Sequence, residues 1–473
     1  MSHSLRISAI AVAASAGWAL PAQAQATDNA AIQQELSAMR AQIQRLENRV
    51  GTLEGEVEQE KARADAAEAK AAATPPVPSA APAIAAAAPS PAAPAKPAVE
   101  VTWDGAPKIT ADGGWSFKPR GRLQVDASGV NAPAGIAASD SLGFGTEVRR
   151  AYLGVDGTVP GGFGYRVEAD FAPESVEVTD LYLTFKATRN ITLTVGHQKP
   201  FWGLEEMTSD LFTTFLERAA FNSAFGFERR VGASAIYSST LVLVQGGVFT
   251  DNMEDLSEDT NNSRSFDGRI VFMPKIGAGQ LHVGGSMHFR DFNDESSTTR
   301  YRARPFVHTT DVRFVDTGNF SATGENSFGG ELAYINGRLR AAAESHWITA
   351  LRPGLSNPTF NGGYAEVGYL LTDDKTSYRG GAFDRIRPEN PLGEGGPGAF
   401  QINARYDWLD LTSGGIMGGQ QQVAGASLVW VPVDYVRFVI NYGHLWIKDS
   451  PVPAGAHRNH ETDAMGIRAQ VDF

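Results

Sequence analysis

Residues 101–473 alternate apolar and polar side chains in one segment after another, each about ten residues long. In the last segment, for example, Met465 and Ile467 alternate with Arg468 and Gln470. Successive side chains of a strand point to opposite faces, so each segment predicts a strand with one apolar and one polar face. Strands in soluble sandwiches commonly have about five or six residues, whereas these are long enough to cross a bilayer at a tilt. The pattern therefore predicts an all-β fold, an antiparallel transmembrane β-barrel.

The number of strands follows from closure of the barrel. Seventeen segments alternate, near 115–128, 147–157, 162–171, 177–187, 190–198, 229–238, 241–250, 264–274, 279–290, 299–309, 326–336, 338–348, 360–372, 399–411, 421–431, 434–446 and 462–473. A single-chain bacterial barrel closes with an even number of strands. Segment 299–309 offers lipid little apolar face, and omitting it keeps the short turns at one end, so we place it in an outer loop, 291–325. Sixteen wall strands remain.

One connection within this series is unusually long. The stretch GHQKPFWGLEEMTSDLFTTFLER, residues 196–218, interrupts the alternation and belongs to a loop covering 199–228. A structureless connection of about 30 residues is usually functional. We expect its aromatic residues to pack on the wall and its charged residues to face the lumen: Lys199, Glu205, Glu206, Asp210, Glu217 and Arg218. The sequence thus predicts a loop that narrows a pore, the alternative being a surface lid with a small core of its own.

The first residues have the pattern of an export signal. Residues 1–24 contain a basic Arg6, then an apolar run, and end in small residues that fit cleavage near Ala24 or Ala26. The apolar run is too short for a membrane-spanning helix, and no later run reaches about 20 apolar residues. We therefore expect the protein to be exported, with its barrel in the outer membrane.

A helical region and a linker precede the barrel. Within residues 27–71, apolar residues alternate at spacings of four and three, at Ile32, Leu36, Met39, Ile43, Leu46, Val50, Leu53 and Val57. This seam predicts an α-helical coiled coil in the periplasm, and the stretch RVGTLE at 49–54 resembles a pattern of parallel trimers. Residues 72–100 are rich in Ala and Pro and predict a semi-rigid linker. We expect a homotrimer.

Composition narrows the functional classes. The 473 residues include no cysteine, which excludes disulfides and thiolate metal sites. We find no cluster of metal-ligating histidines, no phosphate-cradling glycine loop and no Ser-His partner motif, so we expect neither an enzyme nor a bound cofactor or metal, and no nucleic-acid partner. The net charge of -12 does not settle selectivity, since selectivity follows the local charge of a pore.

Several blocks of the barrel carry a family resemblance. They are GRLQVDAS at 121–128, EVRRAYLGVDG at 147–157, VTDLYLTFK at 178–186, PFWGLEEMTS and FLER in the long loop, FERRVGASAIY at 227–237 and FDRIRPENP at 383–391. In this order they resemble the phosphate-selective porin O/P family over the whole barrel. The resemblance implies a trimeric porin of sixteen strands, with loops folded into each pore and a ladder of arginines leading anions to a central constriction.

The resemblance and the spacing together give candidate pore residues. Arg122, one of Arg149 and Arg150, and Arg218 match family positions near the constriction. Arg300, Arg302 and Arg304 are two apart, so in an extended segment they would share a face at about 7 Å spacing. Guanidinium groups suit oxyanions, although this loop could instead bind phosphates of lipopolysaccharide. For Arg229 and Arg230 we expect ion pairs within the wall.

Two carboxylates depart from the family pattern. Glu206 and Asp210 stand where phosphate-selective relatives carry lysine. A carboxylate about 4 Å from a passing anion costs about 4 kcal/mol at an effective dielectric constant of about 20. Either these carboxylates pair with Arg122 and Arg218, or the pore does not prefer phosphate. We expect passive diffusion of small solutes, mainly anions.

Two further expectations concern partners. The terminal aromatic residue, Phe473, closes the last alternating strand, a pattern read by the outer-membrane assembly machinery in similar proteins. Outer-membrane lipid and lipopolysaccharide would surround the wall. The alternative function is structural, with the barrel as an anchor and the coiled coil as a tether to peptidoglycan.

Overall fold

The computed structural model describes residues 99–138, 141–226, 228–257, 262–293 and 298–473. The expected signal peptide, coiled coil and nearly all of the linker lie outside these residues. Among the described residues, no helix has both the length and the apolar character needed to span a membrane.

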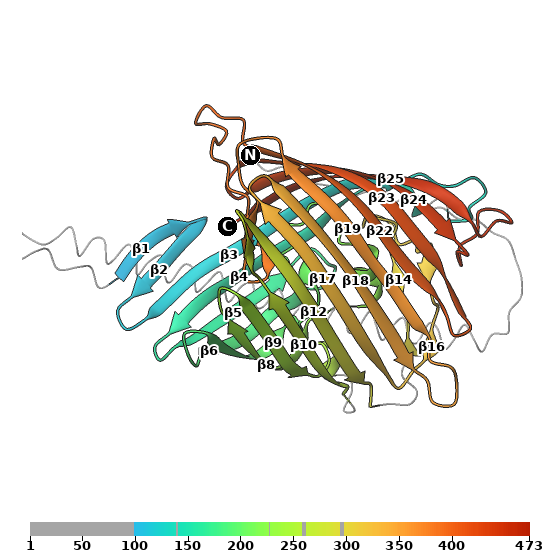
Figure 1. Ribbon diagram of the computed structural model, residues 1–473, viewed down its shortest axis with the longest axis horizontal. Helices are drawn as coiled ribbons and strands as arrows, with labels where there is room; N and C mark the ends of the chain where they lie inside the picture. Colours follow the sequence, from blue (N-terminus) through green and yellow to red (C-terminus); the bar gives the residue numbers. More distant parts are fainter. Residues whose placement is uncertain (1–98, 139–140, 227, 258–261, 294–297) are drawn as a thin grey trace, which may run out of the picture. The chain divides into compact units, whose positions relative to one another are not determined.

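Sixteen antiparallel strands form a closed barrel (Figure 1). They are β3 (Trp115–Val130), β4 (Gly143–Val159), β5 (Phe163–Asp170), β6 (Glu177–Lys186), β7 (Ile191–Gln198), β8 (Arg230–Ser238), β9 (Val242–Phe249), β10 (Arg264–Phe272), β12 (Gly279–Asp291), β17 (Gly324–Asn336), β18 (Leu339–Leu351), β19 (Thr359–Leu370), β22 (Ala399–Ser413), β23 (Ile416–Val433), β24 (Val436–Lys448) and β25 (His460–Asp472). Each strand pairs with the next along the chain, and β25 pairs with β3, with Ala464 opposite Val130. The predicted sixteen-strand barrel is confirmed.

Burial along the strands follows the alternation of the sequence. On β25, Met465 and Ile467 are exposed on the outside of the barrel, while Arg468, Gln470 and Asp472 are buried inside. Closure satisfies every strand edge, which a sheet in lipid requires. The wall therefore presents apolar side chains outward and encloses a polar lumen.

The remaining elements are not part of the sixteen-strand wall. They are the hairpin β1 (Val99–Asp104) and β2 (Ala106–Ala111), the short strands β11 (Lys275–Ile276), β13 (Thr298–Thr299), β14 (Arg302–Ala303), β15 (Val315–Asp316), β16 (Phe320–Ser321), β20 (Ser377–Arg379) and β21 (Ala382–Asp384), the helices α2 (Leu204–Met207) and α3 (Ala220–Ala224), and a 3-10 turn, η2 (Asp255–Ser257). In the β1–β2 hairpin, β2 pairs with the first residues of β3, and the hairpin lies past the end of the barrel (Figure 1).

The connections identify the two ends of the barrel. The short turns after β4, β6, β8, β10, β17 and β23 all lie at the end that holds Trp115 and Phe473. In bacterial outer-membrane barrels the short turns are periplasmic and the long loops extracellular. Residues 299–309 contain only the end of β13 and the two-residue β14, and they form no wall strand. They belong to the connection between β12 and β17 at the outer end.

One long connection lies at the periplasmic end instead. The 371–398 segment joins β19 to β22 and contains the β20–β21 hairpin. It turns into the barrel, where the Arg269 Nη2 donates a hydrogen bond to the Gly381 carbonyl over 2.9 Å and the Arg340 guanidinium lies 3.5 Å from the centre of the Phe383 ring. This segment therefore fills part of the lumen from the periplasmic end.

Candidate functional site

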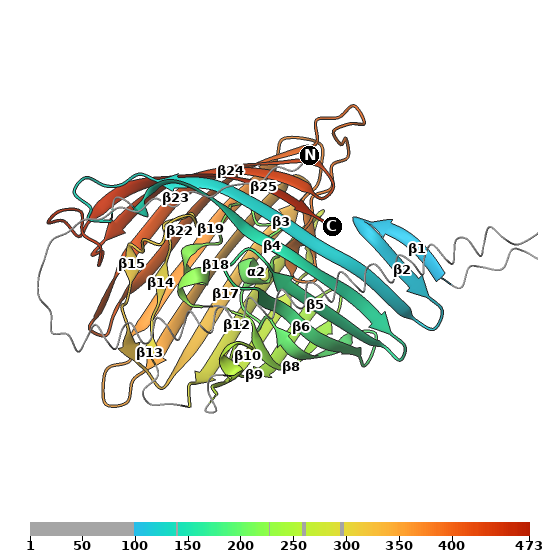
Figure 2. The same cartoon turned by 180° about the vertical axis from the view of Figure 1, so that it is seen from behind.

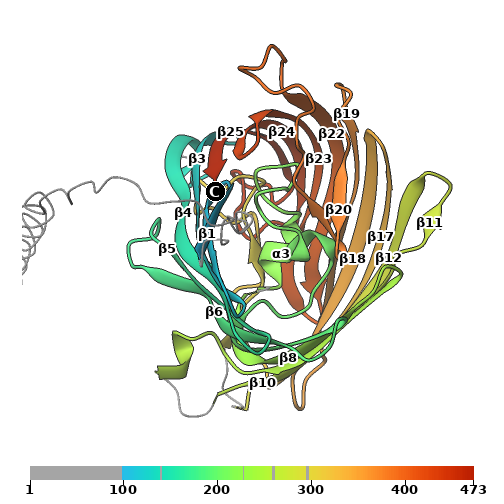
Figure 3. The ribbon, with the colours of Figure 1, turned by 90° about the vertical axis from the view of Figure 1, so that its left-hand side faces the viewer.

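The loop between β7 and β8 crosses the lumen (Figures 2 and 3). Its aromatic residues pack on histidines of the wall: Trp202 lies 4.7 Å from His288 and Phe221 stacks 4.9 Å from His346, between ring centroids. Leu204 is fully buried in the same cluster. The loop is therefore fixed to the wall on the β12–β18 side, as the aromatic content of the sequence indicated.

Polar groups of β24 and β25, on the opposite side of the barrel, bind the rest of this loop. Arg437 donates to the Leu211 carbonyl at 2.8 Å, and Arg468 donates to the Leu216 carbonyl at 2.7 Å. The backbone N–H of Leu216 donates to Asn441 at 3.1 Å. Anchors on opposite sides make the loop a bridge across the barrel rather than a surface lid.

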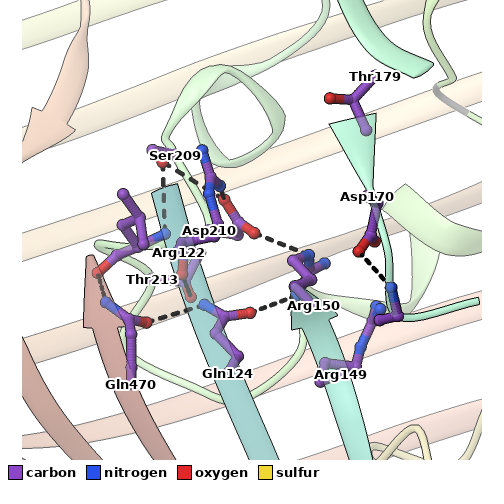
Figure 4. Close-up of polar contacts among 12 residues, drawn as sticks. Arg122, Gln124, Arg149, Arg150, Asp170, Thr179, Ser209, Asp210, Thr213 and Gln470 are labelled. Carbon is purple, nitrogen blue, oxygen red and sulfur yellow. Dashed lines mark hydrogen bonds and ion pairs between the residues drawn. The ribbon is translucent and has the colours of Figure 1, made fainter. Parts of the chain in front are cut away.

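Asp210 sits between two arginines of the wall (Figure 4). Arg122, on β3, forms an ion pair with its Oδ1, and Arg150 Nε, on β4, lies 2.7 Å from its Oδ2. Burial works against the charged form, but Arg122 and then Arg150 outweigh it and hold the pKa of Asp210 well below its usual range. The carboxylate therefore remains ionised at neutral pH, accepting a hydrogen bond from Arg122 and forming an ion pair with Arg150.

Glu206, in the same loop, makes a second pair of contacts. The region of Asp210, Glu206 and their basic partners is called the constriction below. Lys199 Nζ donates to Oε1 at 2.5 Å, and Arg218 Nε lies 3.4 Å from Oε2. Burial disfavours the carboxylate, but Arg218 and Lys199 lower its pKa overall. Burial of Lys199, opposed by Glu206 and reinforced by Arg218, lowers the pKa of Lys199 to about 8.

The expected choice between Arg149 and Arg150 does not arise, because both face the lumen. The ladder shifts register between Gln124 and Val125, where Gln124 pairs with Arg150 and Val125 with Val148. Arg149 is the extra residue of a β-bulge, and such a bulge re-aims a side chain. Arg149 binds Glu217 with two hydrogen bonds, at 2.9 and 3.0 Å.

Two chambers adjoin the constriction. The outer chamber, about 260 Å³, has six arginines in its lining: Arg149, Arg150, Arg218, Arg302, Arg304 and Arg313. The inner chamber, about 660 Å³, has eight basic residues, Lys118, Arg120, Arg122, Arg166, Lys199, Arg229, Arg379 and Arg385, against the carboxylates of Asp156, Asp180, Asp210 and Asp472. Basic residues outnumber acidic ones in both, although the whole chain carries a net charge of -12.

The row of three arginines expected in the outer loop is divided. Arg302 and Arg304 line the outer chamber, whereas Arg300 lines a separate cavity and pairs with Asp316 on β15. The β14–β15 pairing is only two residues long, so the extended face needed for an even row does not form. Burial, followed by the nearby Arg304 and Arg302, lowers the pKa of Arg313 to about 10, a sign of concentrated positive charge. No pattern in the sequence singled out Arg313.

Two other side chains, Glu205 and Arg230, differ from the sequence expectations. Glu205 does not face the lumen: it is buried and pairs with Arg405 at 2.5 Å, and burial raises its pKa to about 7 despite that arginine. Arg229 pairs with Asp180 at 2.6 Å, as expected, whereas Arg230 has no ion pair with any residue that the structure describes. The reason is that the two neighbours face different cavities, Arg229 the inner chamber and Arg230 the separate one.

The described part of the chain offers no metal centre. Within the described ranges, no group of three or more His, Asp or Glu side chains is arranged to hold a metal ion. The charged residues instead form ion pairs between the β7–β8 loop and the wall, beside the two chambers. The arrangement is suited to selecting solutes by charge.

Comparisons with known proteins agree with this geometry. The model of the family "Phosphate-selective porin O and P" matches residues 117–473. An uncharacterized protein of Caulobacter vibrioides is 43% identical over 392 residues, covering 80% of this chain and 79% of the relative. Porin O of Pseudomonas aeruginosa is 29% identical over 356 residues, covering 65% of this chain and 78% of its own.

Among solved structures, OmpT, an outer membrane protein of Vibrio cholerae, aligns with a TM-score of 0.51 at 11% identity, covering 77% of this chain and 99% of its own. At that identity the likeness concerns the fold alone. The family match covers nearly the whole barrel and includes every residue of the constriction described above. This chain belongs to the phosphate-selective porin O and P family of outer-membrane porins.

Proposed function

We propose that this porin conducts small anions passively and that its constriction lacks a tight phosphate site. The main observation behind this proposal is that the two carboxylates already have basic partners. Asp210 pairs with Arg122 and Arg150, and Glu206 pairs with Lys199 and Arg218. Both lie in a lumen rich in basic residues. Arg122 also lies 3.7 Å from Glu168, so four cations face three carboxylates, which leaves a positive charge in the constriction that attracts anions. The pairing that the sequence analysis gave as one alternative is therefore present. We nevertheless propose that phosphate is not bound tightly, because the paired carboxylates occupy the donors that would otherwise close around it.

The test is single-channel recording of the purified protein in planar bilayers. A gradient of potassium chloride should give a reversal potential of the sign for anion preference, and phosphate should block only at high concentration. Cation preference would contradict the conduction proposal. Submillimolar block by phosphate would contradict the second part and indicate that passing phosphate displaces the carboxylates.

The roles of individual residues follow from their positions. We propose that Arg302, Arg304 and Arg313 draw anions into the outer chamber, which Arg149, Arg150 and Arg218 also line. Arg122 and Lys199 then line the inner chamber below it. Arg302 has no ion-pair partner in the described part of the chain, so its charge is available to solutes. A channel role accounts for this charge arrangement without any catalytic step.

Lys199 gives the channel a predicted pH dependence. Its pKa of about 8 means that it loses its proton as pH rises from 7 to 9, which removes one positive charge from the constriction. Anion preference should therefore fall over this range with a midpoint near 8 and then level off. The measurement is the reversal potential between pH 6 and 9.5, with Lys199→Met as the variant in which the step is absent. A step that persists in Lys199→Met would assign the titration to another group.

We also propose a homotrimer, partly held by residues 27–71. OmpT of Vibrio cholerae has been solved in a trimer form, and it aligns with this chain at a TM-score of 0.50 and 12% identity. Deleting 27–71 should leave a folded barrel whose trimer dissociates at a lower temperature than the full chain. Semi-native electrophoresis over a temperature series measures this difference, and an isolated 27–71 peptide that stays monomeric at high concentration would contradict it.

Phe473 is proposed as the signal for the assembly machinery. Its backbone N–H donates to the Gly121 carbonyl at 3.0 Å, and its ring covers Gly121 so closely that a Cβ there would lie 2.4 Å from Cζ. The ring itself is 41% exposed and available for recognition. Deleting Phe473 should lower the amount inserted in cells far more than it changes the conductance of inserted channels; unchanged outer-membrane levels would refute this role.

We retain the structural tether as a separate hypothesis, since the coiled coil on which it depends lies outside the described residues. Binding of the full chain to peptidoglycan sacculi tests it.

A further inference from the structure

A third cavity lies beside the pore at the outer end of the barrel. It has a volume of about 460 Å³ and is lined by the outer ends of β8, β12 and β17, the end of the β7–β8 loop and residues 298–301. Asp251, Asp255 and Ser263, between β9 and β10, complete the described lining. Arg300 lines this side cavity, whereas Arg302, two residues on, lines the outer chamber. The arm carrying both residues therefore separates the side cavity from the conducting path.

Arg230 is the unusual group of the side cavity. The residue is 2% exposed, and its buried Nη1 has no hydrogen-bond partner. Nor does its guanidinium have an ion pair with any described residue. Arg269 and Arg468 are equally buried but paired: Arg269 donates to both oxygens of Glu331, at 2.9 and 2.7 Å, and Arg468 to both oxygens of Asp126, at 2.7 Å each. Arg340 and Arg405 each leave one buried nitrogen without a hydrogen bond, but both form an ion pair with Glu366. A buried cation without a partner is unfavourable unless an anion completes its site.

The rest of the lining restricts the kind of anion. Four carboxylates line the cavity: Glu228, Asp251, Asp255 and Glu325. Two of them are committed, because Asp251 binds Arg290 at 2.7 Å and Glu325 accepts from the Tyr301 hydroxyl at 2.6 Å. Glu228 and Asp255 are exposed and have no ion pair with described residues. Such a lining repels a multiply charged anion but can accept hydrogen bonds from hydroxyl groups of a ligand.

We propose that the side cavity binds a polyhydroxylated monocarboxylate, a sugar acid. The ligand carboxylate pairs with Arg230, its hydroxyl groups donate to Glu228 and Asp255, and Thr298 and Thr299 supply hydroxyl donors. A volume of about 460 Å³ lies within the usual range for small-molecule sites, about 300 to 1,000 Å³. The site would hold such anions at the outer end of the barrel, beside the arginines of the outer chamber. This proposal does not depend on anion conduction.

Calorimetric titration of the full chain in detergent tests this site without measuring conduction. The probes are gluconate, acetate, glucose and inorganic phosphate. We expect gluconate to bind, and acetate, glucose and phosphate to bind at least about tenfold more weakly, since each lacks either the carboxylate or the hydroxyl groups, or carries excess charge. Absence of gluconate binding, or phosphate binding as tight as gluconate, overturns the proposal.

Variants place the binding in the side cavity. Arg230→Gln should weaken gluconate binding by about tenfold or more, and Asp255→Asn, on an exposed turn that tolerates change, should weaken it by about threefold or more. Arg264→Gln removes the same charge from the outer end of β10, outside the cavity, and should leave the affinity unchanged. Arg230→Gln should also raise the unfolding temperature without ligand, because it removes an unpaired buried charge. Gluconate affinity retained in both cavity variants overturns the assignment.

Discussion

Replacing Asp210 with asparagine is expected to lower the phosphate concentration that blocks this channel by about tenfold or more relative to the unmodified protein. In the structure the Asp210 carboxylate lies between Arg122 and Arg150, where the oxygens of a passing oxyanion would meet the same two guanidinium groups. Asparagine keeps the size of the side chain and removes the charge. The two guanidinium groups then become available to a solute.

The expected size of this effect is conservative. A carboxylate about 4 Å from a passing anion costs about 4 kcal/mol at an effective dielectric constant of about 20, and a tenfold change in affinity is only about 1.4 kcal/mol. Glu206→Lys combined with Asp210→Lys should strengthen the block further, because two anions become two cations.

Asp311→Asn is the matched control for Asp210→Asn. It makes the same chemical change at a residue whose side chain is 91% exposed and paired with Arg304 at the outer loop. It should leave phosphate block unchanged. The experiment is a titration of single-channel current with phosphate at fixed chloride, and equal block in all three proteins would show that Asp210 does not control access to the arginines.

The barrel could be predicted from sequence because alternation is a local property that closure then constrains. The strand from His460 to Asp472 shows its two faces directly, and the even strand number excluded 299–309. The loop across the lumen was also predictable, since a long aromatic connection such as 199–228 has to pack on something. Its charged residues were harder to place: both neighbours Glu205 and Glu206 are charged, but only the three-dimensional contacts decide which one meets Arg405.

Other features depend on contacts between residues far apart in the chain. The bulge that turns both Arg149 and Arg150 inward is a one-residue register shift against Gln124, which no local pattern reveals. The even spacing of Arg300, Arg302 and Arg304 gave no hint that Asp316 would hold the first of them in another cavity. The sequence did contain a signal for the periplasmic hairpin, because the gap between the predicted strands 360–372 and 399–411 is too long for a simple turn.

That periplasmic segment leads to the second large effect. Replacing residues 373–397 with a short Asn-Gly turn should raise single-channel conductance by about twofold or more and lower anion preference at the same time. The segment now carries the β20–β21 hairpin into the lumen, where Phe383 lies under Arg340 and Tyr378 bonds His282 at 2.5 Å. Removing this volume widens the periplasmic half of the path.

The fall in anion preference has a separate cause. Arg385 forms an ion pair with Asp472 on the last strand and lies 4.4 Å from the centre of the Tyr435 ring. Without the segment, the inner chamber loses Arg379 and Arg385, and the carboxylate of Asp472 is left facing the path. Conductance and selectivity therefore change in opposite directions.

Arg385→Gln separates these two causes. It keeps the hairpin but removes the charge, so anion preference should fall while conductance stays within the range of the unmodified channel. The loop across the lumen should survive in both variants, because Arg437 and Arg468 still bind its carbonyl groups from the wall. If the shortened protein conducts no better than the full chain, the limiting width lies at the constriction of Asp210 and Glu206, and the periplasmic hairpin only adjusts its charge.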